Sequence, residues 1–141
     1  MIYENSQTLE QEDLIKAEIE AKRSVKLAKT VKFARFDYYM TDLKGNLIAL
    51  AECKSRLTPS DSYPTYIIST EKLLDILYLK RFFGKKSGEE VDFILFVKFI
   101  DGKILYWKHQ KDMQLESKIG GNAQRKPEMM THIPMGLFKE I

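Results

Sequence analysis

The fold of this chain depends on one stretch, residues 34–54, which reads ARFDYYMTDLKGNLIALAECK. Two runs rich in apolar and aromatic residues, 31–40 and 47–56, flank the polar segment DLKGN at 42–46. Such runs on either side of turn residues predict two strands. Gly45 can take the positive φ that a tight turn requires. The stretch therefore predicts a β-hairpin.

Three charged residues stand in this hairpin. Glu52 and Lys54 interrupt the end of an apolar strand, and they share one face because side chains alternate along a strand. Asp37 is on the other strand, directly opposite Glu52 if the loop is residues 44–45. A three-residue loop completed by Gly45 would shift the pairing by one residue. Either register brings the two acids to nearby levels.

This combination of residue types suits metal-assisted hydrolysis of a phosphodiester. Mg²⁺ prefers hard oxygen ligands, commonly one or two carboxylates together with waters and substrate phosphate. A lysine on the same face as one acid can orient the attacking water or stabilise the negative charge that develops. The competing interpretation is a surface ion pair between Glu52 and Lys54 on an edge strand, with Asp37 facing solvent.

The bulk composition is that of a globular protein. The 141 residues, 44% hydrophobic and 30% charged, predict a single domain over 1–141. We expect a cytoplasmic protein without a membrane span, since no apolar run is long enough, no signal-peptide pattern is visible, and the single cysteine excludes an internal disulfide. Residues 1–20 carry six acids and one base, whereas residues 21–141 carry 22 bases and 14 acids. This basic body permits a polyanionic partner without requiring one.

A long helix is expected before the hairpin, over residues 8–29. Its inward face would consist of Leu14, Ala17, Ala21, Val25 and Ala28. Glu18 lies at the edge of that face, and the small alanines beside it leave room for a polar group.

The rest of the chain predicts a mixed sheet with helices against it, an α/β (α+β) fold. A loop over 57–68 that ends in an extended piece is expected first, followed by a helix over 70–83 that is capped by Ser69 and stopped by Gly84. A strand over 93–100, a turn at 101–102 and a partner strand over 104–107 come next. The chain then ends with a loop over 109–131 and an apolar tail over 133–138 that docks on the core. The helix between the second and third strands permits a parallel crossover.

These residues resemble the PD-(D/E)XK nuclease superfamily, which has the restriction-endonuclease-like fold. The resemblance rests on Asp37, on Glu52-Cys53-Lys54 at the end of the hairpin, and on a preceding helix with an inward Glu18. It covers residues 9–107 and implies a core in the order αβββαβ, to which this chain adds a C-terminal hairpin strand. One departure is that Phe36, rather than a proline, precedes Asp37.

The resemblance also implies roles for individual residues. Asp37 and Glu52 would bind Mg²⁺ or Mn²⁺, and Lys54 would be the catalytic lysine. Glu18 would match the helix acid that contacts a metal through water in many members. Lys72, early in the second helix, would contribute to the site. Arg56 would contact nucleic-acid phosphate, although a turn onto the surface explains it equally well.

By this resemblance the chain is a small metal-dependent deoxyribonuclease, with an endonuclease favoured over an exonuclease. Small members often act as homodimers, and many are encoded by phages. Three alternatives remain open: a nucleic-acid-binding module on the same fold without catalysis, a resolvase of branched DNA such as Holliday junctions, and a small protein-interaction domain in which the hairpin charges lie on the surface.

Overall fold

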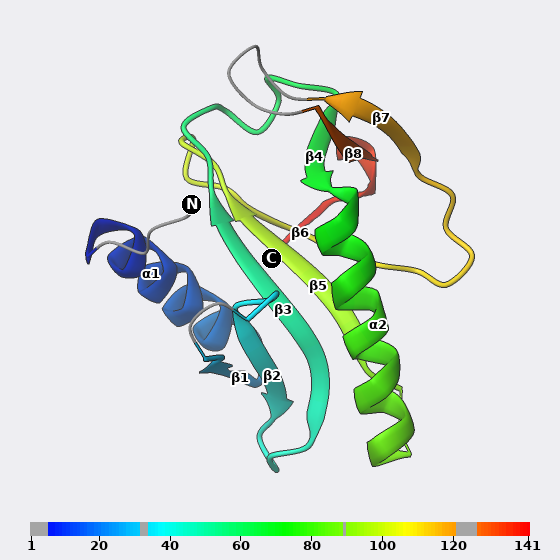
Figure 1. Cartoon of the computed structure of the whole chain (residues 1–141). Helices are drawn as coiled ribbons and strands as arrows, with labels where there is room; N and C mark the ends of the chain where they lie inside the picture. The colour runs from blue at the N-terminus through cyan, green and yellow to red at the C-terminus, as the bar shows by residue number, and fades with distance from the viewer. Residues whose placement is uncertain (1–5, 32–33, 89, 121–126) are drawn as a thin grey trace.

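The computed structural model of the protein describes residues 6–31, 34–88, 90–120 and 127–141, with the backbone alone for residues 6–10 (Figure 1). Its elements are α1 (Ser6–Lys22), β1 (Val25–Lys29), β2 (Tyr38–Asp42), β3 (Leu47–Ser55), β4 (Thr65–Ser69), α2 (Thr70–Ser87), β5 (Asp92–Lys98), β6 (Ile104–Lys108), β7 (Glu116–Gly120), β8 (Glu128–Pro134), the short 3₁₀ helix η1 (Met135–Leu137) and β9 (Lys139–Glu140). Among these residues, neither α-helix is both long and apolar enough to cross a membrane.

Six strands form the main sheet in the order β1-β2-β3-β5-β6-β9. Strands β3 and β5 pair in parallel, and the other neighbours pair antiparallel. A parallel pair needs a crossover connection, which here contains α2. The mixed sheet and the parallel crossover expected from the sequence are confirmed, and β3 lies inside the sheet rather than at its edge.

The two helices cover opposite faces of this sheet, as Figure 1 shows. On the α1 face, Ile15 and Ile19 pack with a buried cluster that includes Ala51 and Cys53 of β3. The α2 face has its own cluster, to which β3 contributes Leu50. Because side chains alternate along a strand, residues 50, 52 and 54 of β3 face α2. Cys53, which alternates with these residues, belongs to the cluster on the α1 face and is 1% exposed.

The chain after residue 22 differs from the prediction. The first helix ends at Lys22 instead of continuing to residue 29, and Val25–Lys29 forms the edge strand β1 against β2. Its burial pattern explains the strand, since Leu27 is buried while both neighbours are exposed. Strand β2 is also shorter than expected. It begins at Tyr38, and residues 32–33 of the predicted strand lie outside the described ranges.

The buried face of α1 is likewise not the predicted one. Leu14 is 61% exposed, whereas Glu12, Ile15 and Ile19 are buried at helical spacing. The prediction chose the wrong phase because apolar residues stand next to each other at 14 and 15.

Helix α2 begins as predicted. The hydroxyl of Ser69 accepts the N–H of Lys72 at 3.4 Å, which confirms the N-cap. The helix continues past Gly84, however, and ends at Ser87, with Gly88 at φ 75° donating its N–H to the carbonyl of Gly84.

A second sheet, in the order β4-β8-β7, lies at the start of α2 (Figure 1). It corrects the predicted loop over 109–131, because β7 and β8 form an antiparallel pair there; residues 121–126 lie outside the description. Strand β8 alternates in burial, and Thr131 and Ile133 point inward. The tail docks as expected, with Phe138 9% exposed.

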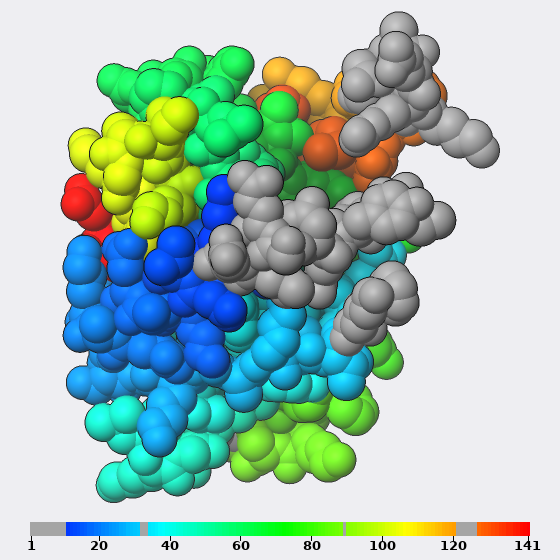
Figure 2. Space-filling model, turned by 90° about the vertical axis from the view of Figure 1, so that its left-hand side faces the viewer, coloured from blue at the N-terminus to red at the C-terminus, as the bar shows by residue number. Residues whose placement is uncertain are grey.

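The core order α1-β1-β2-β3-α2-β5 has the αβββαβ sequence of a restriction-endonuclease-like fold, with β4 inserted before α2. Figure 2 shows the face covered by α1 (blue), with the loop over 57–64 (green) beside the turn that follows β5 (yellow-green) at its upper end. This loop leads from β3 to β4, so the second sheet is tied to the end of the strand that carries Glu52 and Lys54.

Candidate active site

Glu52 is a buried acid in the middle of the main sheet. It lies on β3 level with Leu95 of β5, and it is 2% exposed. It faces α2, where the ammonium of Lys72 approaches its Oε1 to 2.7 Å. The ion pair of Glu52 is therefore with Lys72 on a helix, and the surface pair with Lys54 on an edge strand is ruled out.

The register of the hairpin places Asp37 level with Glu52. The turn is a three-residue loop, in which the N–H of Asp42 donates to the carbonyl of Asn46 and Gly45 has φ 89°. A bulge between Met40 and Thr41 then shifts the pairing back, so that Tyr38 is opposite Ala51. The three-residue loop considered from the sequence occurs, and the bulge cancels its offset, so that Asp37 is level with Glu52 as the loop at residues 44–45 would also have placed it.

Backbone groups of β3 fix Asp37. Its N–H donates to the carbonyl of Ala51 at 3.0 Å, and its Oδ2 accepts the N–H of Cys53 at 2.9 Å. Within the described ranges no other hydrogen bond reaches this carboxylate. Asp37 is thus anchored by one oxygen, directly before β2, the strand next to the one that carries Glu52.

Burial and the neighbouring charges change the pKa of the Glu52 carboxyl. Burial raises the pKa of Glu52 above the ordinary carboxyl value, and the negative charge of Asp37 adds to the rise. The ammonium groups of Lys72 and Lys54 oppose it. Asp37, Lys54 and Lys72 therefore all lie within reach of the charge of Glu52, and the two lysines favour its ionised form.

Lys54 differs from Lys72 in having no carboxylate partner within the residues that the structure describes. It is half-buried on the same face as Glu52, and among the described residues no ion pair or hydrogen bond occupies its ammonium group. Lys72 already neutralises Glu52. Lys54 is consequently the cation that is available to a substrate.

Arg56 continues the row of Glu52 and Lys54 just beyond the end of β3. Its Nη2 donates to the hydroxyl of Tyr66 at 2.5 Å, and its guanidinium lies over that ring, 4.9 Å from the centroid. Burial raises the pKa of Tyr66 to about 12, and the negative charges of Glu52 and Asp37 add to the rise. The positive charge of Arg56 lowers this pKa in part. Tyr66 of β4 is thus an additional neighbour of the acids that sequence reasoning did not identify.

Glu18 does not join this cluster. It lies on α1, on the opposite face of the sheet from Glu52, and pairs with Lys98 at 2.9 Å. The buried acid of α1 is instead Glu12, which is 8% exposed and pairs with Lys29 at 2.7 Å. Burial raises the pKa of Tyr38, which directly follows Asp37, and the charge of Glu12 adds to that rise.

Two carboxylates, Asp37 and Glu52, are the hard oxygen ligands that the site offers. In the described part of the chain no group of three or more histidine, cysteine, aspartate or glutamate side chains is placed to hold a metal. A magnesium ion needs only one or two carboxylates when waters and phosphate complete its shell. Oε1 of Glu52 is paired with the ammonium of Lys72, and among the described residues no hydrogen bond or ion pair reaches Oε2 of Glu52 or Oδ1 of Asp37, so one oxygen of each acid is left for a cation. The residues fit such an ion.

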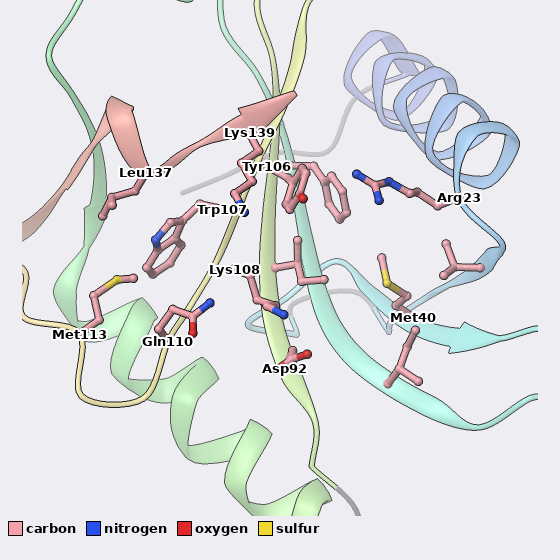
Figure 3. A pocket seen from close by; sticks show the side chains of 14 residues that line it. Arg23, Met40, Asp92, Tyr106, Trp107, Lys108, Gln110, Met113, Leu137 and Lys139 are labelled. Carbon is pink, nitrogen blue, oxygen red and sulfur yellow. The ribbon is translucent and has the colours of Figure 1, made fainter. Parts of the chain in front are cut away.

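A cavity of about 520 Å³ lies away from Asp37, Glu52 and Lys54. Figure 3 shows Arg23 and Met40 on one side of it, Met113 and Leu137 on the other, and Tyr106 between them. Met40 and Tyr106 belong to the α1 side of the sheet. Asp37, Glu52 and Lys54 do not line this cavity, so its size does not make it the site of the chemistry.

Comparison with known proteins gave one finding. A family model described as "Phage putative PDDEXK endonuclease" matches residues 1–141. No curated protein and no solved structure matched the chain.

Proposed function

The chain belongs to the family of phage PD-(D/E)XK endonucleases, and we propose that it hydrolyses phosphodiester bonds of DNA with the help of Mg²⁺ or Mn²⁺. The observation that carries the proposal is the side-by-side placement of a buried Glu52, an anchored Asp37 and a Lys54 that has no ion pair in the described part of the chain. A buried carboxylate on a central strand is costly, and a fold that needed only stability would place an apolar residue there.

Each residue has a separate part in the proposed reaction. Asp37 and Glu52 would hold the cation, which would supply a water of lowered pKa and offset the charge of the phosphate. Lys54 would orient the attacking water and stabilise the negative charge that develops on the phosphate oxygens. Lys72 is a positioning residue, because it touches Glu52, opposes the rise in the pKa of that carboxyl and directs it.

Glu18 has no part in this proposal, because its ion pair with Lys98 on the other face leaves it away from Glu52. Arg56 would bind phosphate beside the cut, since it extends the row of Glu52 and Lys54 along the chain.

The test is incubation of the purified protein with linear, supercoiled, single-stranded and four-way-junction DNA in Mg²⁺, Mn²⁺ or EDTA. We expect cleavage with a metal and none in EDTA, and we expect Glu52→Gln to abolish it. Cleavage confined to the junction would favour the resolvase. If DNA is retarded on a gel but never cut, the protein is a binding module and the enzyme proposal fails.

A further inference from the structure

A cleft of about 400 Å³ adjoins the row of Glu52, Lys54 and Arg56. It lies between the loop over 57–64 and the second sheet. Arg56 and Tyr66, the two residues that contact each other beside the acids, both line it. A cleft of this size lies at the small end of ligand sites and fits one nucleoside, not a duplex.

The walls of the cleft suit a flat, partly apolar ring. Tyr63 stands 64% exposed at its edge, and Phe99, Met130 and Met135 supply apolar surface. Thr58, Ser60 and Thr65 add hydroxyl groups. Aromatic faces for stacking, together with a few hydrogen-bonding groups, are what an unstacked base needs.

The cleft is held open by hydrogen bonds that do not involve a ligand. Ser60 donates its N–H and its hydroxyl to Oδ2 of Asp101, at 3.0 and 2.7 Å. The N–H of Ile100 donates to the carbonyl of Thr58 at 3.1 Å, and the N–H of Met135 to that of Pro64 at 2.9 Å. These bonds tie both ends of the loop to the two sheets, so the shape of the cleft precedes binding.

Arg56 connects the cleft to the proposed reaction. It follows Lys54 by two residues, and its N–H donates to the carbonyl of Lys98 at 2.8 Å, which continues the pairing of β3 with β5. A strand advances about 6.6 Å over two residues, close to the spacing of neighbouring phosphates in an extended strand. A nucleic-acid strand that runs along this row therefore reaches the cleft within a nucleotide or two of the phosphate at Lys54.

We infer that the cleft binds one unpaired base next to the phosphate that is cut, so that the enzyme prefers DNA with single-stranded nucleotides beside the cleavage point. The inference rests on the proposed nuclease function and narrows its substrate. Bases within a duplex are stacked and paired, and extruding one costs free energy that an overhang or flap does not require.

Binding in EDTA tests the inference without any cleavage. The probes are a fluorescein-labelled blunt duplex and the same duplex with a five-nucleotide overhang, each titrated with the full chain and followed by anisotropy. We expect the overhang to bind about five-fold or more tightly than the blunt end, the gain typical of one base stacked on an aromatic side chain.

Two tyrosine variants make the test specific. Tyr63→Ala should remove the preference for the overhang and leave blunt-end binding unchanged. Tyr78→Ala is the matched control, because Tyr78 is 70% exposed on α2 and lines neither of the two cavities described above, and it should bind as wild type does.

Equal affinity for the two probes, or equal weakening of both by Tyr63→Ala, would overturn the inference. A change of sedimentation from dimer to monomer in Tyr63→Ala would also overturn it, since the cleft would then be a contact between copies. The proposed nuclease function fails separately: a protein that prefers the overhang but never cuts with Mg²⁺ or Mn²⁺ supports the cleft and refutes the catalysis.

Discussion

Two lysines at this site have different tasks, although both lie within reach of Glu52. Lys72 forms a 2.7 Å ion pair with Glu52 and is a quarter exposed, whereas Lys54 is half-buried and unpaired among the described residues. A buried carboxylate needs a partner to stay ionised, and Lys72 provides it. Lys54 can therefore serve the reaction without weakening the site.

Replacing Lys54 should remove activity but not structure. We expect Lys54→Met to lower the rate of DNA cleavage by about 10²-fold or more, the usual loss when one group that stabilises transition-state charge is removed. Its urea unfolding curve should stay close to that of wild type, because no described ion pair is lost. A variant that cuts normally, or one that is inactive only because it is unfolded, would speak against this role.

Glu52 should lower the stability of the metal-free protein. Its pKa is raised by burial, so as the pH rises above the ordinary carboxyl value the unfolded state ionises first and the folded state loses stability. In EDTA at pH 8 we expect Glu52→Gln to raise the free energy of unfolding, by on the order of 1 kcal/mol. At pH 4, near the ordinary carboxyl pKa and below the raised one, the difference in free energy of unfolding between Glu52→Gln and wild type should shrink. Urea unfolding at pH 8 and at pH 4 checks this. A variant less stable than wild type at pH 8 would contradict the account.

Strand parity explains which site residues could be predicted. The shared face of Glu52 and Lys54 follows from the alternation of any strand and needed no structure. The ion pair of Glu52 with Lys72 could not be predicted in this way, because Lys72 comes from a helix whose rotation about its axis the sequence leaves open. The same freedom led to Glu18 rather than Glu12 as the inward acid of α1, since Leu14 and Ile15 offer two apolar faces.

At the level of elements, the hairpin sets the distance between the two acids. Its three-residue loop and its bulge shift the register in opposite directions and bring Asp37 level with Glu52. The loop depends on Gly45, whose φ of 89° is unfavourable for any residue with a side chain.

A glycine replacement should measure this dependence. Nothing lies within 4 Å of a Cβ added at Gly45, so Gly45→Ala carries only backbone strain, and we expect a loss of about 1 kcal/mol in urea unfolding. Gly136→Ala is the matched control, because its surroundings are equally open and its φ is not positive. It should be neutral or slightly stabilising. Equal effects at the two positions would show that the turn does not require the left-handed conformation.

The elements that the sequence did not predict are short and depend on partners. The sequence of β1 predicts a helix, since Lys-Leu-Ala-Lys has high helix propensity. It forms a strand because it pairs with β2. Strands β7 and β8 stand in a polar region, and β7 is mostly exposed. The hairpin, α2 and β5 could be predicted because their apolar patterns are long and bounded by turn residues.

Across the whole molecule, the site lies where the hairpin, α2 and the second sheet meet. The hairpin brings Asp37, Glu52 and Lys54, α2 brings Lys72, and the second sheet brings Tyr66. A cation held by the two acids would bind the folded chain only, so it should also raise the stability of the protein.

Calorimetric titration of Mn²⁺ into the metal-free protein at pH 7.5 tests the central claim, that Asp37 and Glu52 together form a cation site. The account predicts that wild type binds Mn²⁺, that Asp37→Asn and Glu52→Gln each abolish the binding, and that Glu18→Gln retains it. Binding that survives in Asp37→Asn and Glu52→Gln, or that is lost in Glu18→Gln while its fold is intact, would contradict the account.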